Sequence, residues 1–133
     1  MSAFTNHAEE LLLTWLFTTS TATRPTAWYV ALHTDDPGEA GSANEVDTED
    51  DDYARQSITF DDPVADSGQV LSDLQASWTA ASDADDYTIT HISIWDAATS
   101  GNCLMKGPLV ISWDQTADGI FTLDVGKVIA ALD

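Results

Sequence analysis

Residues 87–114, YTITHISIWDAATSGNCLMKGPLVISWD, contain two β-rich runs separated by a turn-forming segment. The segment AATSGN between them is small and polar, and Gly101 and Asn102 can adopt positive φ at little cost, so we expect the chain to reverse there. Thr, Ile, Tyr and Trp fill the first arm, Tyr87–Trp95, and the second arm is rich in Leu, Val and Ile. The stretch therefore predicts a β-hairpin. Pro108 is expected at an edge position or a bulge of the second arm, because proline cannot donate to a ladder.

Short apolar runs on both sides of this hairpin predict the strands that cover it, since two strands alone are marginal in water. Thr26–His33 is apolar on both faces and is predicted to be a central strand. Further strands are expected at Tyr53–Phe60, Gln69–Ser72, Ala76–Ala81, Gly119–Asp124 and Lys127–Leu132. The pattern predicts a mainly β fold: a β-sandwich or open barrel of six to eight short, mostly antiparallel strands.

One amphipathic helix is predicted over about residues 7–17. Asn6 and Glu9 have the spacing of a capping box, and apolar residues then recur at helical spacing. The apolar positions are Ala8, Leu11, Leu12, Trp15 and Leu16. We expect this stripe to cover one side of the sheet. The alternative is a docking face for a partner, for which Leu11, Leu12, Trp15 and Leu16 are the interface candidates.

Length and charge restrict the class of protein. With 133 residues and 44% hydrophobic content, we expect a single β-rich domain over residues 1–133. The formal net charge is −19 with only four Lys and Arg, which argues against nucleic-acid binding because that depends on clustered cations. No apolar run approaches the roughly 18 residues of a membrane span, so no membrane partner is expected. We interpret the acidity as adaptation to high salt; the alternatives are a basic partner or an ordinary acidic protein.

The longest irregular segment is an acidic loop over about residues 34–52, expected to face solvent or a neighbouring molecule. Asp47, Glu49, Asp51 and Asp52 are candidate ligands for a hard cation such as calcium. A loop beginning at Asp47 lacks the sixth-position Gly and twelfth-position Glu of an EF-hand, however. We favour a solvated loop and predict no metal and no cofactor.

Nucleophilic or zinc chemistry would depend on His7, His33, His91 and Cys103. No second ligand follows any of the histidines at the spacing of a zinc site, and no nucleophile motif surrounds the cysteine. Acids are so abundant that a carboxylate pair has no specificity as a catalytic signal. We predict no catalytic residues and no enzyme.

Three tryptophans, Trp78, Trp95 and Trp113, could form a platform for a sugar or peptide if they were exposed. Their strand neighbours are aliphatic, so we predict that they belong to the core.

Several segments resemble small virion proteins of tailed phages that are described as tail-fibre-like or head-decoration-like. The segments are TNHAEELLL at 5–13, TAWYVALHTDDPGEAG at 26–41, YARQSITF at 53–60, THISIWDAATSGNCLMKGPL at 90–109 and GIFTLDVG at 119–126. The resemblance implies a β-rich structural subunit with no catalytic residues to carry over. The acidic enlargement of residues 45–52 departs from the usual pattern and suggests a host that lives in high salt.

These observations together predict a non-enzymatic structural subunit of a tailed virus particle, seated on the capsid surface or on a tail, fibre or collar appendage. Its expected partners are copies of itself, with a trimer as the first expectation, and other virion proteins such as major capsid or tail proteins. It would be assembled in the host cytoplasm and then reside in the virion. The alternative is a secreted carbohydrate-binding module with a calcium-binding acidic loop.

Overall fold

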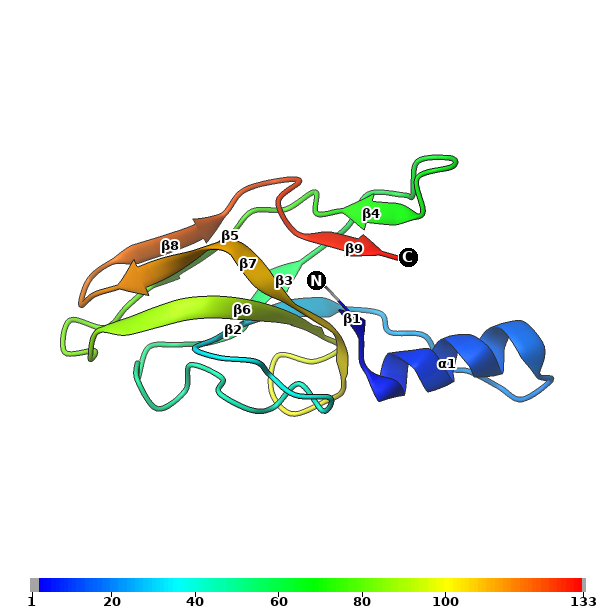
Figure 1. The fold of residues 1–133 in the computed structure, drawn as a ribbon, viewed down its shortest axis with the longest axis horizontal. Coiled ribbons are helices and arrows are strands. Elements are labelled where there is room, and N and C mark those ends of the chain that lie inside the picture. The colour runs from blue at the N-terminus through cyan, green and yellow to red at the C-terminus, as the bar shows by residue number, and fades with distance from the viewer. Residues whose placement is uncertain (1–2, 133) are drawn as a thin grey trace.

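The computed structural model describes residues 3–132 and confirms a mainly β fold (Figure 1). Nine strands and one helix are present in this part of the chain, one strand more than the upper end of the expected range. All ladders are antiparallel. The elements are β1 (Ala3–Phe4), α1 (Asn6–Phe17), β2 (Trp28–His33), β3 (Gln56–Ile58), β4 (Gln69–Leu71), β5 (Ala76–Thr79), β6 (Tyr87–Trp95), β7 (Cys103–Gln115), β8 (Ile120–Leu123) and β9 (Ile129–Ala131).

The hairpin of β6 and β7 is the centre of the largest sheet, whose strand order is β1-β7-β6-β2-β3. Its turn differs in detail from the expectation. Ser100 and Gly101 hold the positive φ angles, 53° and 75°, whereas Asn102 does not. Asn102 instead donates from its backbone N and its side-chain Nδ2 to the carboxylate of Asp96, at 2.7 and 2.9 Å. The prediction for Asn102 was therefore wrong, because this residue fixes the turn by hydrogen bonding and not by its backbone conformation.

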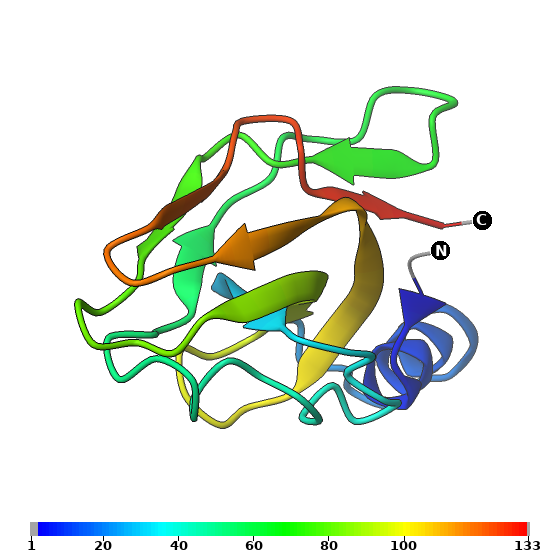
Figure 2. The same ribbon diagram turned by 60° about the vertical axis from the view of Figure 1, so that its left-hand side comes forward.

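Two smaller ladders, β5 with β8 and β4 with β9, complete the fold. β8 lies beside β7 and β5 beside β3, so six strands surround a common core as an open barrel (Figure 2). Side chains span the two places where no ladder forms. The rings of Trp113 and Phe121 lie 5.8 Å apart between β7 and β8, and Trp78 Nε1 donates to the Ala54 carbonyl at 2.9 Å, next to β3. β2 is a central strand between β6 and β3, as predicted.

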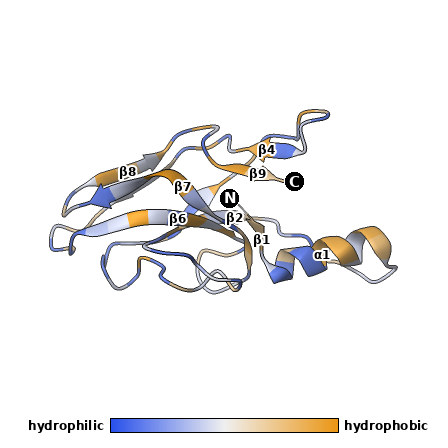
Figure 3. Cartoon of the chain, viewed as in Figure 1, coloured by the Kyte–Doolittle hydropathy of each residue, from blue (hydrophilic) through white to orange (hydrophobic). Residues whose placement is uncertain are grey.

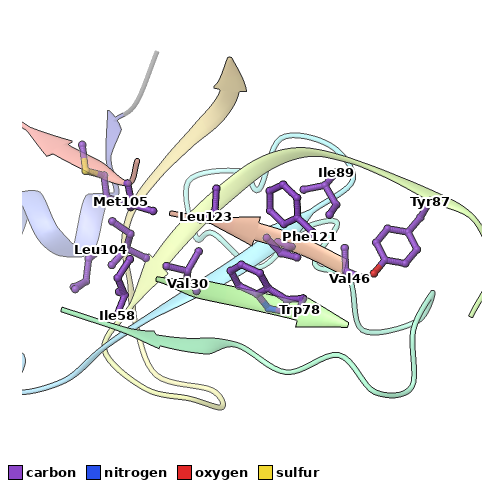
Figure 4. Packing of buried hydrophobic residues seen from close by; sticks show 14 of the residues in the cluster. Val30, Val46, Ile58, Trp78, Tyr87, Ile89, Leu104, Met105, Phe121 and Leu123 are labelled. Carbon is purple, nitrogen blue, oxygen red and sulfur yellow. The ribbon is translucent and has the colours of Figure 1, made fainter. Parts of the chain in front are cut away.

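The core fills the interior of this barrel (Figure 4). Its larger members are Val30, Leu32, Ile58, Trp78, Tyr87, Ile89, Phe121 and Leu123. Trp78 is buried there, and Trp95 is buried in a second, small cluster with Ala31 and Cys103. The prediction for Trp113 was wrong, because its side chain is 46% exposed at the rim and packs on one side against Phe121.

An irregularity in β7 explains the position of Pro108. Ile89 of β6 faces Trp113, but His91 faces Pro108, so β7 contains more residues than β6 over this interval. The expected bulge at Pro108 is thus confirmed. The extra residues include Val110 and Ile111, which are fully or almost fully exposed.

Helix α1 does not cover the sheet, and that expectation was wrong. The helix runs outward from the body, and Ala8 is its one buried residue (Figure 1). The cap is Thr5, not Asn6: the Thr5 Oγ1 accepts from the Ala8 N, and β1 immediately before it pairs with β7. Because the cap is anchored at this sheet edge, the helix axis points away from the core. Among residues 3–132 there is no helix of the length and apolar character that a membrane span requires.

Candidate functional site

The distal half of α1 is an exposed apolar surface, visible as the orange end of the helix in Figure 3. Leu11 and Leu12 are half-buried, while Trp15 and Leu16 are 69% and 58% exposed. Leu13 and Phe17, which the expected stripe did not include, are also exposed, at 58% and 77%. The helix end is therefore apolar around most of its circumference, and a helix of this kind is normally buried in a larger assembly.

The base of the helix is held firmly even though its end is free. Thr5 donates from its backbone N to the Leu104 carbonyl at 3.1 Å and from its hydroxyl to the Cys103 carbonyl. Glu9 N donates back to the Thr5 carbonyl at 3.0 Å, which closes the first turn. At the other end, Thr18 donates twice to the Thr14 carbonyl and satisfies one of the last helical acceptors. The apolar side chains are thus carried by a helix that is anchored to the sheet at its base.

The 34–52 loop is packed onto the body at several points and is not merely solvated. Val46 is fully buried, and Asp50 is 4% exposed. The carboxylate of Asp50 accepts from the Ala81 N and from the Tyr87 hydroxyl, both at 3.0 Å. Burial, followed by this hydrogen bond to Asp50, raises the pKa of Tyr87 well above its usual value. The role of Asp50 was not predictable from the sequence, because nothing local distinguishes it from the acids on either side.

The four candidate cation ligands surround this buried acid without forming a ligand cage. Asp47, Asp51 and Asp52 are exposed, and Glu49 is half-buried and accepts from the Thr48 hydroxyl at 3.0 Å. Within residues 3–132 no group of three or more His, Cys, Asp or Glu side chains is arranged to hold a metal ion.

Arg55 joins the loop to the central hairpin, which the sequence did not reveal. Its guanidinium forms a bidentate pair with Glu45, with both N–O distances 2.8 Å, and lies 3.7 Å from the ring centroid of Trp95. It also donates to the carbonyls of Ala97 and Ser100 in the turn. Burial alone would raise the pKa of Glu45, but the hydrogen bonds and charge of Arg55 outweigh it and lower that pKa. The one feature of the sequence that could have pointed to Arg55 was the scarcity of cations in this chain.

Lys106 makes a second connection between loop and sheet. Its Nζ lies 2.8 Å from the Asp36 carboxylate and 3.8 Å from that of Glu39. The hydrogen bond from Lys106 lowers the pKa of Asp36, and the same bond raises the pKa of Lys106. Two of the four cationic side chains are therefore engaged within the molecule.

His33 is fully buried in a neutral hydrogen-bonded chain. Trp95 Nε1 donates to the Ser93 hydroxyl at 2.7 Å. Because this oxygen accepts from Trp95, its own proton is donated to His33 Nε2, also at 2.7 Å. The protonated Nδ1 then donates to the Ala43 carbonyl at 2.9 Å. Burial lowers the pKa of His33, which agrees with a neutral ring.

Among the remaining candidate reactive groups, His91 faces His33 across the β2–β6 ladder, but no hydrogen bond within residues 3–132 joins the two rings. His7 is exposed on α1, and His91 is hydrogen-bonded to its neighbour Thr90. Cys103 is buried beneath the turn, and burial raises the pKa of its thiol to about 11. The surroundings of these side chains indicate structural roles.

One hollow of about 310 Å³ lies along α1 itself, between the helix and residues 21–23, and two others lie near the base of the helix. A polar one of about 610 Å³ is bordered by the start of α1, the loop and the hairpin turn, and Arg55 in its wall already makes four hydrogen bonds within the molecule. The other, which we call the β7–β9 groove, measures about 270 Å³. Its wall is mostly aliphatic and consists of Ile92, Ile94, Met105–Val110, Leu123 and Lys127–Ile129.

Comparison with known protein families matches residues 3–131 to one family model, described as podophage GP4 fiber I protein gp80. The search of curated proteins gave no match. The matched residues include the β6–β7 hairpin and helix α1, which projects from the body of the protein. The chain therefore belongs to the family of the podophage GP4 fiber I protein gp80.

Proposed function

We propose that this chain is a non-enzymatic structural subunit of a tailed virus particle, which assembles in symmetric copies within a fibre or a related appendage. Membership of a phage fibre family supports the structural role in a virion. It favours an appendage over the capsid surface as the position of the subunit.

The observation that carries the assembly part of this proposal is the exposed end of α1. Trp15, Leu16 and Phe17 each expose more than half of their surface to water, on a chain whose net charge is −19. Contiguous exposed apolar surface on a soluble protein marks an interaction site. We infer that copies associate through these residues together with Leu11 and Leu12, and a trimer is the first symmetric arrangement to test.

The interior of the molecule supports a structural role. The buried polar side chains Asp50, His33 and Ser93 are occupied by hydrogen bonds that join loop, strand and turn. Arg55 likewise uses its donors on Glu45 and on turn carbonyls. These groups stabilise the fold, and although Arg55 borders the polar hollow, four of its five N–H donors are used within the molecule.

The experiment that tests the proposal is light scattering after size-exclusion chromatography, over a range of salt concentrations. The wild type is expected to form a discrete oligomer, and Trp15→Ala combined with Leu16→Ala is expected to be a monomer. Val64→Ala is the matched control because Val64 is 67% exposed but lies between β3 and β4, outside α1. A wild type that stays monomeric at all salt and protein concentrations would overturn the assembly.

The carbohydrate-binding alternative makes a different prediction in solution. It requires saturable binding of a glycan or of calcium at micromolar concentration, with calcium affinity reduced by Asp51→Asn and Asp52→Asn. A structural subunit shows neither.

A further inference from the structure

The β7–β9 groove is unusual for this chain because no acid lines it. Among its twelve wall residues are two of the four cations, Lys106 and Lys127, and no Asp or Glu, although the chain contains 23 acids. Lys106 is paired with Asp36, whereas Lys127 is exposed and forms no ion pair within residues 3–132. At this groove a second strongly acidic molecule can approach without meeting a facing carboxylate.

The distal half of α1 has the complementary properties. Residues 11–23 contain no charged side chain, and the last turn of the helix has no basic residue. The carbonyl end of a helix carries a partial negative charge, which a nearby cation stabilises. The helix end is thus an apolar, uncharged knob whose only electrostatic requirement is a positive group near its C-terminus.

Both features lie at the same end of the molecule. Phe4 of β1 pairs with Met105 in the groove wall, and α1 begins directly after β1. Figures 1 and 2 show β9 and α1 on this side in both views. One rotation axis passing beside this end can bring the helix of each copy to the groove of the next.

We propose that the last two turns of α1 of one copy dock in the β7–β9 groove of a second copy, with Trp15 or Phe17 inserted and Lys127 facing the helix C-terminus. This inference rests on the proposed assembly in copies and specifies its contact. The contact is head-to-tail, so it closes into a ring if the rotation allows.

The dimensions of the groove suit this occupant. At about 270 Å³ it falls just below the range of roughly 300–1,000 Å³ typical of small-molecule sites. A single aromatic side chain in such a pocket, surrounded by flatter contacts, is the usual anchor of a protein interface. Val110 and Ile129, which are 102% and 44% exposed, form an apolar rim for those surrounding contacts.

Two double variants test the helix side and the groove side of the contact separately. The helix variant, Trp15→Ala with Phe17→Ser, keeps the groove intact, and the groove variant, Val110→Asp with Lys127→Glu, keeps the helix intact. All four positions are exposed, so folding is expected to be retained and is checked by circular dichroism. Ile111→Asp is the matched control, because Ile111 is exposed beside Val110 but does not line the groove.

Mixing the two variants distinguishes head-to-tail docking from other arrangements. Each variant alone is expected to be monomeric in light scattering at molar salt, and the mixture to form a one-to-one heterodimer, because one intact helix then meets one intact groove. Ile111→Asp is expected to assemble like the wild type. If the groove variant assembles by itself, or if the mixture stays monomeric, the docking is overturned while assembly in copies stands. A monomeric wild type overturns both.

Cysteine pairing provides a measurement that does not depend on loss of assembly. A mixture of Phe17→Cys and Lys127→Cys chains is expected to yield a disulfide-linked heterodimer on mild oxidation, whereas Val64→Cys in place of Lys127→Cys is not. The native Cys103 is buried and does not compete. Equal cross-linking of Phe17→Cys to both partners would contradict the proposal.

Discussion

Gly41 lies where the 34–52 loop packs against Cys103 and Trp95 of the hairpin. Its φ is +74°, and a Cβ added there would lie 2.3 Å from Cys103 Sγ. Gly38 in the same loop has a similar φ of +71°, but a Cβ added there meets nothing within 4 Å. The two glycines therefore separate the cost of backbone conformation from the cost of a collision.

We predict that Gly38→Ala lowers the free energy of unfolding by about 1–2 kcal/mol, the usual cost of a left-handed non-glycine residue. Gly41→Ala should lose that amount and roughly 1–3 kcal/mol more from overpacking against Cys103. Urea unfolding of both variants measures the difference. Equal losses would mean that the loop moves away from Cys103 without cost.

His33 should make stability depend on pH near neutrality. Its pKa is lowered in the folded state by burial, so the unfolded chain binds a proton more readily. The free energy of unfolding is therefore expected to fall as the pH drops below about 6.5, the ordinary histidine value. Glu45 and Asp36, whose pKa values are lowered, add their losses only at lower pH, below their ordinary carboxyl values.

His33→Gln tests this assignment between pH 7 and pH 5. The variant removes the titrating group and is expected to show a flat stability profile over this interval, whatever its absolute stability. His7→Gln is the control and should keep the slope of the wild type, since His7 is exposed on α1; His91 is not suitable because it faces His33 across the β2–β6 ladder. A slope that survives in His33→Gln would assign the titration to another group.

At the scale of elements, Thr5 determines where α1 begins and how it is joined to the sheet. Its hydroxyl accepts from the Ala8 N and donates to the Cys103 carbonyl. Thr5→Val keeps the shape but removes both bonds, and we expect a loss of about 1 kcal/mol with faster amide exchange throughout α1. Thr18→Val, at the exposed C-cap, should accelerate exchange only in the last turn. Unchanged exchange in Thr5→Val would show that β1 alone holds the helix.

The elements were largely predictable because their signals are local. Alternating β-branched and aromatic residues located β6 with its observed limits, and proline chemistry located the bulge at Pro108. The direction of α1 was not predictable, because an apolar stripe indicates that a face packs against something but does not indicate whether the partner is the same chain. Long-range partners such as Arg55 with Glu45 were also invisible, since their pairing depends on which loop the finished sheet brings near the turn.

At the scale of the whole molecule, two of the four cations are paired with acids of the 34–52 loop. Arg55 pairs with Glu45 and Lys106 with Asp36, so the surface acids have few positive neighbours. With a net charge of −19, their mutual repulsion opposes the compact state and opposes contact between copies. Counterions at a Debye length of about 3 Å in molar salt remove most of this repulsion.

We therefore predict that the free energy of unfolding rises from low to molar potassium chloride. A variant with Asp61→Asn, Asp62→Asn and Asp66→Asn tests the electrostatic cause, because these exposed loop residues contribute charge without an ion pair in the described chain. It should be more stable than the wild type at low salt and should have a shallower salt dependence, measured by urea unfolding. If salt instead acts by strengthening apolar burial, the two proteins will have the same slope. If the wild type is equally stable at both salt concentrations, adaptation of the surface to high salt is wrong.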